Sequence, residues 1–172
     1  MATGTRGRRK WRSRLQPARQ ASAEAWPSHP ARPDAIAPTR ELACLFCRRD
    51  DPTLNRVLLE SRNFYARYDN FPAAEGHVEV VPKRHVESFF ELTPGEVAEA
   101  YGLINDVQRE LRRLYSPEGY TIGVNEGRAA GRSVDHLHIH LIPRYYGDVD
   151  DPRGGIRQVL PNCEPAKWSA TS

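Results

Sequence analysis

The sequence predicts an α+β fold built on an antiparallel sheet, and three observations support this prediction. Five short segments have the composition of strands, and one long segment has helical periodicity. Residues typical of turns or helix ends bound these segments. Their order is three strands, one helix and two strands, so strands and helix do not alternate. This order is typical of a small α+β domain.

The expected strands are short runs rich in β-branched and aromatic residues. The first two are joined by a polar turn at residues 61–63, and Pro82 closes the third. A fourth and a fifth follow the helix. The five strands are expected at residues 57–60, 64–68, 77–81, 120–125 and 134–142.

The expected helix begins at a capping box. Thr93 supplies the capping hydroxyl, Pro94 occupies the first helical position, and Glu96 follows three residues after the cap. Proline at position 117 is expected to stop the helix near Tyr115. Apolar residues recur between these ends at helical spacing, namely Val97, Tyr101, Ile104, Val107, Leu111 and Leu114.

Residues 1–40 differ in composition from the rest of the chain. They hold nine basic side chains against two acidic ones, net +7, whereas residues 41–172 hold 16 basic and 20 acidic ones, net −4. This Arg-, Pro- and Ala-rich segment contains five prolines and no hydrophobic period. Such a segment buries too little apolar surface to offset its ordering entropy, so we expect a disordered tail. A nucleic-acid partner is not expected, except for contact through this tail.

Hydropathy and cysteine content narrow the class of protein. No run reaches the roughly 20 apolar residues of a membrane helix, and no short apolar segment follows the basic N-terminus as in a secretory signal. We therefore expect a cytoplasmic protein without a membrane partner. Three cysteines, at positions 44, 47 and 163, are too few for a disulfide framework.

The most informative run is His136 to Ile142, in which histidine alternates with leucine and isoleucine. Strand side chains alternate between faces, so His136, His138 and His140 are expected to share one face. An ordinary solvent-facing strand is one interpretation. A catalytic zinc site with an open position is another, and a nucleophilic imidazole is the third. The alternation does not decide between the last two.

This run resembles the signature of the histidine-triad (HIT) family, which alternates three histidines with apolar residues. Further blocks are similar in the same order, at residues 69–72, 76–78, 81–85, 124–127 and 131–134. The resemblance extends from Cys44 to Arg144. It implies a HIT-like fold, with a five-stranded antiparallel sheet and one long and one short helix. It also implies a HIT domain over residues 41–150 and a homodimer with one continuous sheet.

The resemblance also implies catalytic roles. His138 matches the nucleophile, which attacks the α-phosphorus of a nucleotide and forms a nucleotidyl-histidine. His140 matches a residue that contacts the phosphate, and an imidazole cluster can stabilise its developing charge. His136 is expected to support the cluster or to face the leaving group.

Four other positions match substrate-binding positions of the family. Asp69 is expected at the ribose hydroxyls, which a carboxylate can accept as hydrogen-bond donors. Asn125 and Ser133 are expected beside the leaving group and phosphate, and His77 in the nucleotide pocket. Arg132 stands where many relatives have glutamine. Its charge either meets a longer phosphate chain or faces solvent, and the second is favoured.

Cys44 and Cys47 have the spacing that metal sites and redox sites share. With His85 and His136 they resemble the structural zinc set of bacterial HIT proteins. Two thiolates and two imidazoles complete a tetrahedral site. The alternative is a pair of reduced cysteines that pack as small apolar side chains. We favour a structural zinc ion.

The function implied by the resemblance is that of a nucleotide hydrolase or transferase. Its substrates would be dinucleoside polyphosphates, nucleoside phosphoramidates or adenylylated compounds, with diadenosine tetraphosphate the first to test. A nucleotide-binding module with little turnover and a metal-dependent phosphohydrolase are the alternatives. Residues 151–172 are expected to form an extension, either over the active site with Arg153 or Arg157 at phosphate, or over the sheet edge.

Overall fold

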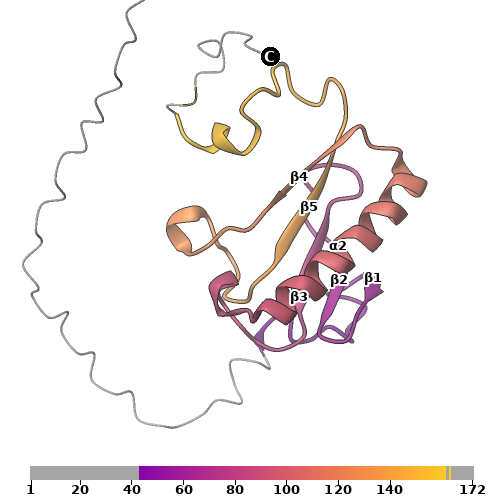
Figure 1. The fold of residues 1–172 in the computed structure, drawn as a ribbon, viewed down its shortest axis with the longest axis vertical. Coiled ribbons are helices and arrows are strands. Elements are labelled where there is room, and N and C mark those ends of the chain that lie inside the picture. Colours follow the sequence, from indigo (N-terminus) through magenta and orange to yellow (C-terminus); the bar gives the residue numbers. More distant parts are fainter. Residues whose placement is uncertain (1–42, 162, 164–172) are drawn as a thin grey trace, which may run out of the picture. The chain divides into compact units, whose positions relative to one another are not determined.

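The computed structural model describes residues 43–161 and 163, so the expected tail over residues 1–40 lies outside the described part. Five strands and one α-helix make up the fold (Figure 1). They are β1 (Val57–Glu60), β2 (Phe64–Tyr68), β3 (Val78–Pro82), α2 (Pro94–Tyr115), β4 (Gly119–Gly123) and β5 (Ile139–Arg144). Three short 3-10 helices accompany them, η1 (Phe89–Glu91), η2 (Arg128–Ala130) and η3 (Gly155–Val159). Within the described residues, no helix has the length and apolar character needed to cross a membrane.

The strands form a single antiparallel sheet in the order β1-β2-β3-β5-β4. The predicted α+β class is thereby confirmed, and β1 and β2 have the predicted bounds. Strand β3 begins one residue later than predicted and includes the proline, while β4 begins and ends slightly earlier. The last strand, β5, lies between β3 and β4.

The start of β5 differs from the prediction of a strand over residues 134–142. The strand begins at Ile139, so His140 lies within it, whereas His136 and His138 precede it. Pairing with β3 stops at Val80 opposite Ile139. Farther along β3, Pro82 has no N–H to extend a ladder, and its carbonyl oxygen lies 2.9 Å from Nε2 of His136. The chain before Ile139 is therefore held by side chains and loops instead of the sheet.

Helix α2 begins and ends as predicted. The Glu96 backbone N–H donates to the Thr93 hydroxyl (3.3 Å), and the Thr93 N–H donates to the Glu96 carboxylate (2.8 Å), which completes the capping box. At its other end, Ser116 adopts a left-handed conformation with φ +49° immediately before the proline at 117. Both ends are thus decided by local sequence.

One face of the sheet packs against α2. The buried helix residues are Ala100, Leu103, Val107 and Leu111, and they cover apolar side chains of β2, β3 and β5. Burying a large apolar side chain contributes about 1.5–3 kcal/mol. The helical apolar pattern in the sequence contains a second set that stays exposed, Val97, Tyr101 and Leu114.

The opposite face carries the histidines and is covered near β2 by the segment that precedes β1. Phe46 packs there with Tyr65 and Val81, and the Tyr65 hydroxyl donates to the Phe46 carbonyl (2.7 Å). Asn55 donates from its side-chain amide to two carbonyls of the same segment, at 2.9 and 3.0 Å. This segment therefore brings residues 44–47 to the histidine face.

A buried ion pair lies on the same face. Arg67 of β2 and Glu79 of β3 are register partners, and their side chains are only 2% and 7% exposed. Arg67 also donates to the Asn70 side chain (2.6 Å) and to the Leu54 carbonyl (3.0 Å). Burial and the nearby Asp69 carboxylate raise the pKa of Glu79 to about 7, against the effect of Arg67. The pair thus ties the sheet to the loop after β2.

Removal of one partner of this pair should destabilise the fold more than removal of both. We expect Arg67→Met to lower the free energy of unfolding at pH 8 by about 3–5 kcal/mol, because it leaves a carboxylate buried without its partner. The double variant Arg67→Met/Glu79→Leu should recover most of that loss. Urea denaturation measures both effects. Arg113→Met, which breaks the exposed ion pair with Glu110, is the control and should change little. A double variant as unstable as the single one would contradict this account.

Candidate active site

His138 is held as a neutral imidazole with one free nitrogen. Its Nδ1 lies 2.8 Å from the backbone carbonyl oxygen of His136, so Nδ1–H donates and Nε2 keeps an unprotonated lone pair. Burial lowers the pKa of His138, while the hydrogen bond to His136 opposes that shift. A neutral imidazole with a free lone pair is chemically able to act as a nucleophile or a base.

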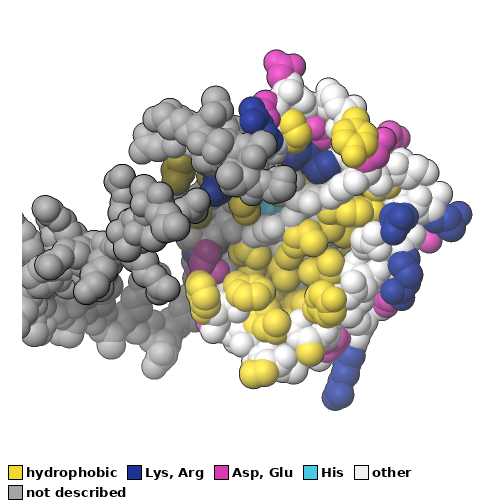
Figure 2. Space-filling model, turned by 45° about the horizontal axis from the view of Figure 1, so that its top comes forward, with side chains coloured by type: hydrophobic (Ala, Val, Ile, Leu, Met, Phe, Trp, Pro, Cys, Tyr) yellow, Lys and Arg dark blue, Asp and Glu magenta, His cyan; other side chains and the backbone are white. Residues whose placement is uncertain are grey.

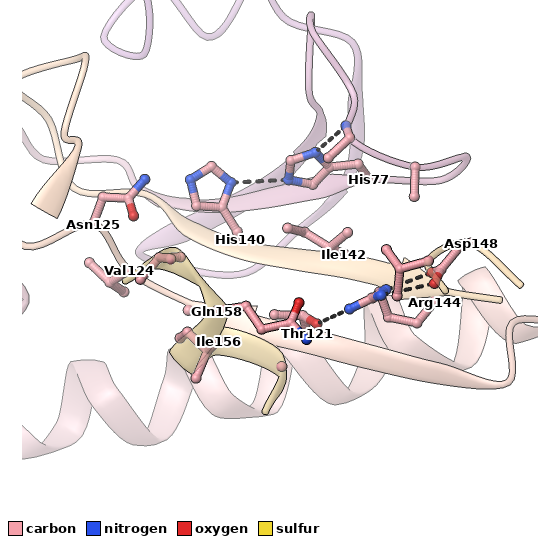
Figure 3. Close-up of a pocket in the computed structure, with 16 residues that line it drawn as sticks. His77, Thr121, Val124, Asn125, His140, Ile142, Arg144, Asp148, Ile156 and Gln158 are labelled. Carbon is pink, nitrogen blue, oxygen red and sulfur yellow. Dashed lines mark hydrogen bonds and ion pairs between the residues drawn. The ribbon is translucent and has the colours of Figure 1, made fainter. Parts of the chain in front are cut away.

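A chain of hydrogen bonds fixes the proton of His140 in the same way (Figure 3). The Ala73 backbone N–H donates to Nδ1 of His77 (3.2 Å), so the hydrogen of His77 is on Nε2. That Nε2 lies 3.0 Å from Nδ1 of His140 and donates to it. The hydrogen of His140 is therefore on Nε2, which makes this nitrogen a donor.

The rings of His138 and His140 meet edge to face, with their centroids 4.9 Å apart. Burial, together with the neighbouring His138 and His77, lowers the pKa of His140 to about 4. Burial also lowers the pKa of His77. The cluster is thus uncharged near neutral pH. It combines a free nitrogen on His138 with an N–H donor on His140.

Two carboxylates border these histidines. The ligand atoms of Asp69, His77 and His140 lie within 4.8 Å of one another, as do those of Glu79, His138 and His140. One oxygen of Asp69 accepts from the backbone N–H of residue 71 (2.7 Å), which fixes the orientation of this carboxylate. Asp69 is predicted from the sequence but Glu79 is not, although its position two residues after His77 places it on the same face.

Asn125 and Ser133, the other two predicted substrate residues in this region, lie in different places. Asn125, just after β4, lines a pocket together with His77 and His140. Ser133 is exposed in the loop before the triad and lies outside that lining. The structure therefore brings three of the four predicted substrate residues, Asp69, His77 and Asn125, close to His140, and places Ser133 farther along the approach loop.

The favoured prediction that Arg132 faces solvent is wrong. Its side chain is 14% exposed and donates to the Glu87 carbonyl (2.9 Å). Ion pairs to Glu87 (3.4 Å) and Asp135 (3.6 Å) hold it from two sides. Its positive charge nevertheless acts on His138, because it helps to lower the pKa of that imidazole. Glu87, which is 45 residues away in the sequence, and Asp135 account for this placement.

The four predicted zinc ligands come together at the start of the histidine face. Sγ of Cys44 lies 3.4 Å from Nδ1 of His136, and Sγ of Cys47 lies 3.3 Å from Nδ1 of His85 and 3.6 Å from that of His136. Tetrahedral Zn–S and Zn–N bonds place ligand atoms about 3.5 Å apart. The contact of His136 Nε2 with the Pro82 carbonyl leaves Nδ1 unprotonated toward the sulfurs, as a metal ligand requires. The donor set and its spacing therefore fit zinc.

A cavity of about 500 Å³ extends from His140 toward the sheet edge (Figure 3). Its walls come from the loop before β3, from β4 and β5, and from η3. Ile142 and Arg144 are not among the predicted site residues, although they follow His140 at the two-residue spacing of a strand face. Helix η3 contributes Ile156, Gln158 and Val159 to the wall. Arg153, one of the two arginines considered for a contact with phosphate, pairs instead with Asp151 (2.8 Å).

Comparison with known proteins gives consistent matches. The model of the HIT domain matches residues 53–147. An uncharacterized HIT-like protein of Methanocaldococcus jannaschii is 37% identical over 106 residues, 61% of this chain and 81% of that protein. A Zn-bound histidine triad family protein of Mycobacterium smegmatis has a similar structure, with a TM-score of 0.57 and 31% identity over 63% of this chain and 79% of that one.

Two relatives carry the names of enzymes. The asymmetrical bis(5'-nucleosyl)-tetraphosphatase of Schizosaccharomyces pombe is 35% identical over 80 residues, 46% of this chain and 44% of that enzyme. An AP-4-A phosphorylase of Mycobacterium tuberculosis is 35% identical over 95 residues, 55% of this chain and 49% of that enzyme. The matched region spans less than half the length of each of these enzymes.

The low pKa of His140 predicts a loss of stability in mild acid. Between an ordinary pKa of about 6.5 and the folded value of about 4, the unfolded chain binds the extra proton. The free energy of unfolding should therefore fall as the pH is lowered through this window. NMR titration should place the midpoint of the His140 ring near 4, and His140→Asn should flatten the pH dependence of urea denaturation. A ring midpoint near 6.5 would contradict the assigned neutral network.

Proposed function

Because the chain belongs to the HIT family, we propose that it is a nucleotide hydrolase or transferase that forms a nucleotidyl intermediate on His138. Its substrates would be dinucleoside polyphosphates, nucleoside phosphoramidates or adenylylated compounds. The observation that carries the proposal is the fixed tautomer of His138, whose Nδ1–H is held by the His136 carbonyl so that Nε2 is free. The two enzymes named among the relatives support diadenosine tetraphosphate as the first compound to test.

In the first step, the Nε2 lone pair of His138 forms a bond to the α-phosphorus. The bond from that phosphorus to the leaving oxygen or nitrogen breaks, and the leaving group takes the electron pair. A leaving nitrogen also takes a proton from solvent, so that it departs as an amine. His140 donates its Nε2–H to a non-bridging phosphate oxygen and stabilises the negative charge there. The carbonyl of His136, which accepts from Nδ1–H, stabilises the positive charge that develops on the His138 ring.

In the second step, a water molecule or a phosphate ion attacks the same phosphorus. The N–P bond breaks, and its electron pair returns to Nε2 of His138. When water is the acceptor, the proton that it loses passes to solvent. A covalent route of this kind replaces one difficult displacement by two easier ones. In this proposal Asp69 binds the ribose hydroxyls, His77 orients His140, and Asn125 and Ser133 contact the phosphate side of the leaving group.

A metal-dependent phosphohydrolase is the second candidate function. The two carboxylate–histidine sets that share His140 have donors close enough to hold an ion. The covalent route has the stronger support, because the same nitrogens already form an ordered hydrogen-bond chain that leaves one lone pair free.

We further propose a structural zinc ion held by Cys44, Cys47, His85 and His136. Four protein ligands leave no open position, so the ion would stabilise the fold and supply no catalytic water. Both nitrogens of His136 are then engaged, Nδ1 at the metal and Nε2 at the Pro82 carbonyl. The ring of His136 is thus assigned to the zinc ligands, and its backbone carbonyl oxygen accepts the hydrogen bond from His138.

The partner that best fits the exposed apolar surface is a second copy of this chain. Strand β4 is an edge of the sheet, and Ile122 on it is 51% exposed. Tyr101 of the adjoining helix is 67% exposed, and the Tyr120 hydroxyl joins β4 to α2 through the carbonyl of residue 108. Figure 2 shows hydrophobic side chains gathered into one patch with charged groups at its margin. An unpaired edge beside an apolar patch favours pairing of two copies.

Substitution of the nucleophile tests the proposed chemistry. His138→Ala should lower turnover of diadenosine tetraphosphate by several orders of magnitude, because the two-step route is lost. Acid quench of the wild type with labelled substrate should trap a nucleotide on His138. The variant should still bind the nucleotide, as measured by calorimetry. Near-normal turnover by the variant would contradict the mechanism, and wild-type binding without turnover would favour a binding module.

Removal of one thiolate tests the zinc site. Ligands from three separate segments gather only in the folded chain, so metal affinity contributes to folding stability. Cys47→Ser should lower both the zinc content, expected at about one ion per chain, and the melting temperature. Cys163→Ser is the matched control and should change neither. A folded, active wild-type protein without metal would contradict the proposed site.

Introducing negative charge into the apolar patch tests whether two copies of the chain associate through it. The wild type should sediment as a dimer, and Tyr101→Glu/Ile122→Glu should sediment as a folded monomer, because buried unpaired carboxylates oppose association. Phe71→Glu changes an even more exposed aromatic residue outside α2 and β4 and should leave the dimer intact. A monomeric wild type at micromolar concentration would refute the proposal.

A further inference from the structure

The order of the strands determines how a bound substrate would be oriented across the sheet. Asp69 follows β2 and Asn125 follows β4, while the strand that carries His140 lies between β3 and β4. These two residues therefore stand on opposite sides of the histidines. In displacement at phosphorus, the attacking and leaving atoms are roughly in line. A nucleotide with its ribose at Asp69 and its phosphorus at His138 would extend its leaving group toward β4, an inference that rests on the proposed function.

The cavity that begins at His140 lies in this direction (Figure 3). Its volume of about 500 Å³ is ample for a ring system. Four aliphatic side chains are among its lining residues, Val124, Ile142 of β5, and Ile156 and Val159 of η3. The two residues of η3 are 58% and 79% exposed, as expected for apolar side chains that a ligand would cover.

Helix η3 is held close to the sheet by specific contacts. A Cβ atom added to Gly123 of β4 would lie only 3.3 Å from Cδ1 of Ile156, so glycine at this position allows the close approach. The Gln158 amide donates to the carbonyls of Asp151 (2.8 Å) and Arg153 (2.7 Å), which fixes the loop that leads into η3. The apolar wall is therefore formed before a ligand arrives.

The charge of the cavity disfavours polyphosphate leaving groups. Among its described lining residues, Arg144 carries the one full positive charge. Two bonds to Asp148 (2.6 and 2.9 Å) and one to the Thr121 hydroxyl (3.2 Å) occupy that guanidinium. A polyphosphate chain would bring several negative charges into a site without a free cation, which is costly.

From these observations we propose that the cavity between β4, β5 and η3 binds the leaving group and selects those that carry an uncharged apolar ring. Ile156 and Val159 are the specificity-determining residues, since both line the cavity and are exposed without a ligand. Among the substrate classes named above, this ranks ring-bearing amides of a nucleotide above dinucleoside polyphosphates.

Two amides with the same transferred nucleotide isolate the effect of the ring. The probes are adenosine 5'-phosphoramidate and its N-benzyl derivative. The wild type should prefer the benzyl compound in kcat/KM by at least about tenfold, the size of a modest apolar contact. Ile156→Ser/Val159→Ser should abolish that preference. Leu160→Ser, which changes an exposed residue beside η3 but outside the cavity lining, should keep it.

A gain-of-function variant tests the charge argument. Ile156→Arg adds a cation to the cavity wall, so it should raise kcat/KM for diadenosine tetraphosphate relative to the benzyl amide. An unchanged ratio of the two would count against the proposed charge selection.

Rapid-quench kinetics separates this proposal from the proposed function. The leaving group departs in the first step, so the serine variant should slow formation of the nucleotidyl-enzyme from the benzyl amide alone and leave its hydrolysis unchanged. Unchanged hydrolysis also reports that the variant is folded. Equal slowing of both steps with every substrate would place the transferred nucleoside in the cavity and overturn the proposal. An intermediate that forms with an unaltered benzyl preference would overturn it while the proposed function stands. Absence of any nucleotidyl-enzyme would refute both.

Discussion

The constraint on which the molecule depends is the two-sided character of the chain around β5. Ile139 and Leu141 are buried against α2 on one face, and His138 and His140 occupy the other. Strand side chains alternate, so a shift of register by one residue would bury imidazoles in the core and expose the apolar pair. The hydrophobic core therefore determines the orientation of the histidines, and the site is as rigid as the packing beneath it.

Backbone carbonyls then decide what each imidazole can do. Pro82 ends β3 and leaves its carbonyl to His136, and the carbonyl of His136 in turn accepts from His138. A longer β5 would use these oxygens in its ladder. Because β5 begins only at Ile139, the carbonyl oxygens of Pro82 and His136 remain available as hydrogen-bond acceptors. They fix the tautomers of His136 and His138, and the start of the strand is thus linked to the chemistry of the triad.

Electrostatics in the site follows from burial. The histidines are neutral, and the nearby charges of Arg67 and Arg132 are paired with carboxylates of other segments. A charged phosphate would therefore meet the N–H donor of His140, and the described residues that line the cavity beyond it offer no free cation. This distribution suits one reacting phosphate better than a chain of them, which connects the proposed mechanism with the proposed selection of the leaving group.

The sequence alone determined the features that depend on neighbours in the chain. The capping box at Thr93 and the strands at 57–60 and 64–68 were predictable because propensity and turn chemistry act locally, and the four metal-site residues were selected from the resemblance. Tertiary structure decided the start of β5, the burial of Arg132, the pairing of Arg67 with Glu79 and the wall that η3 forms beside His140. Each of these rests on a contact between segments far apart in sequence, whose energy depends on burial and on partners that only the folded chain brings together.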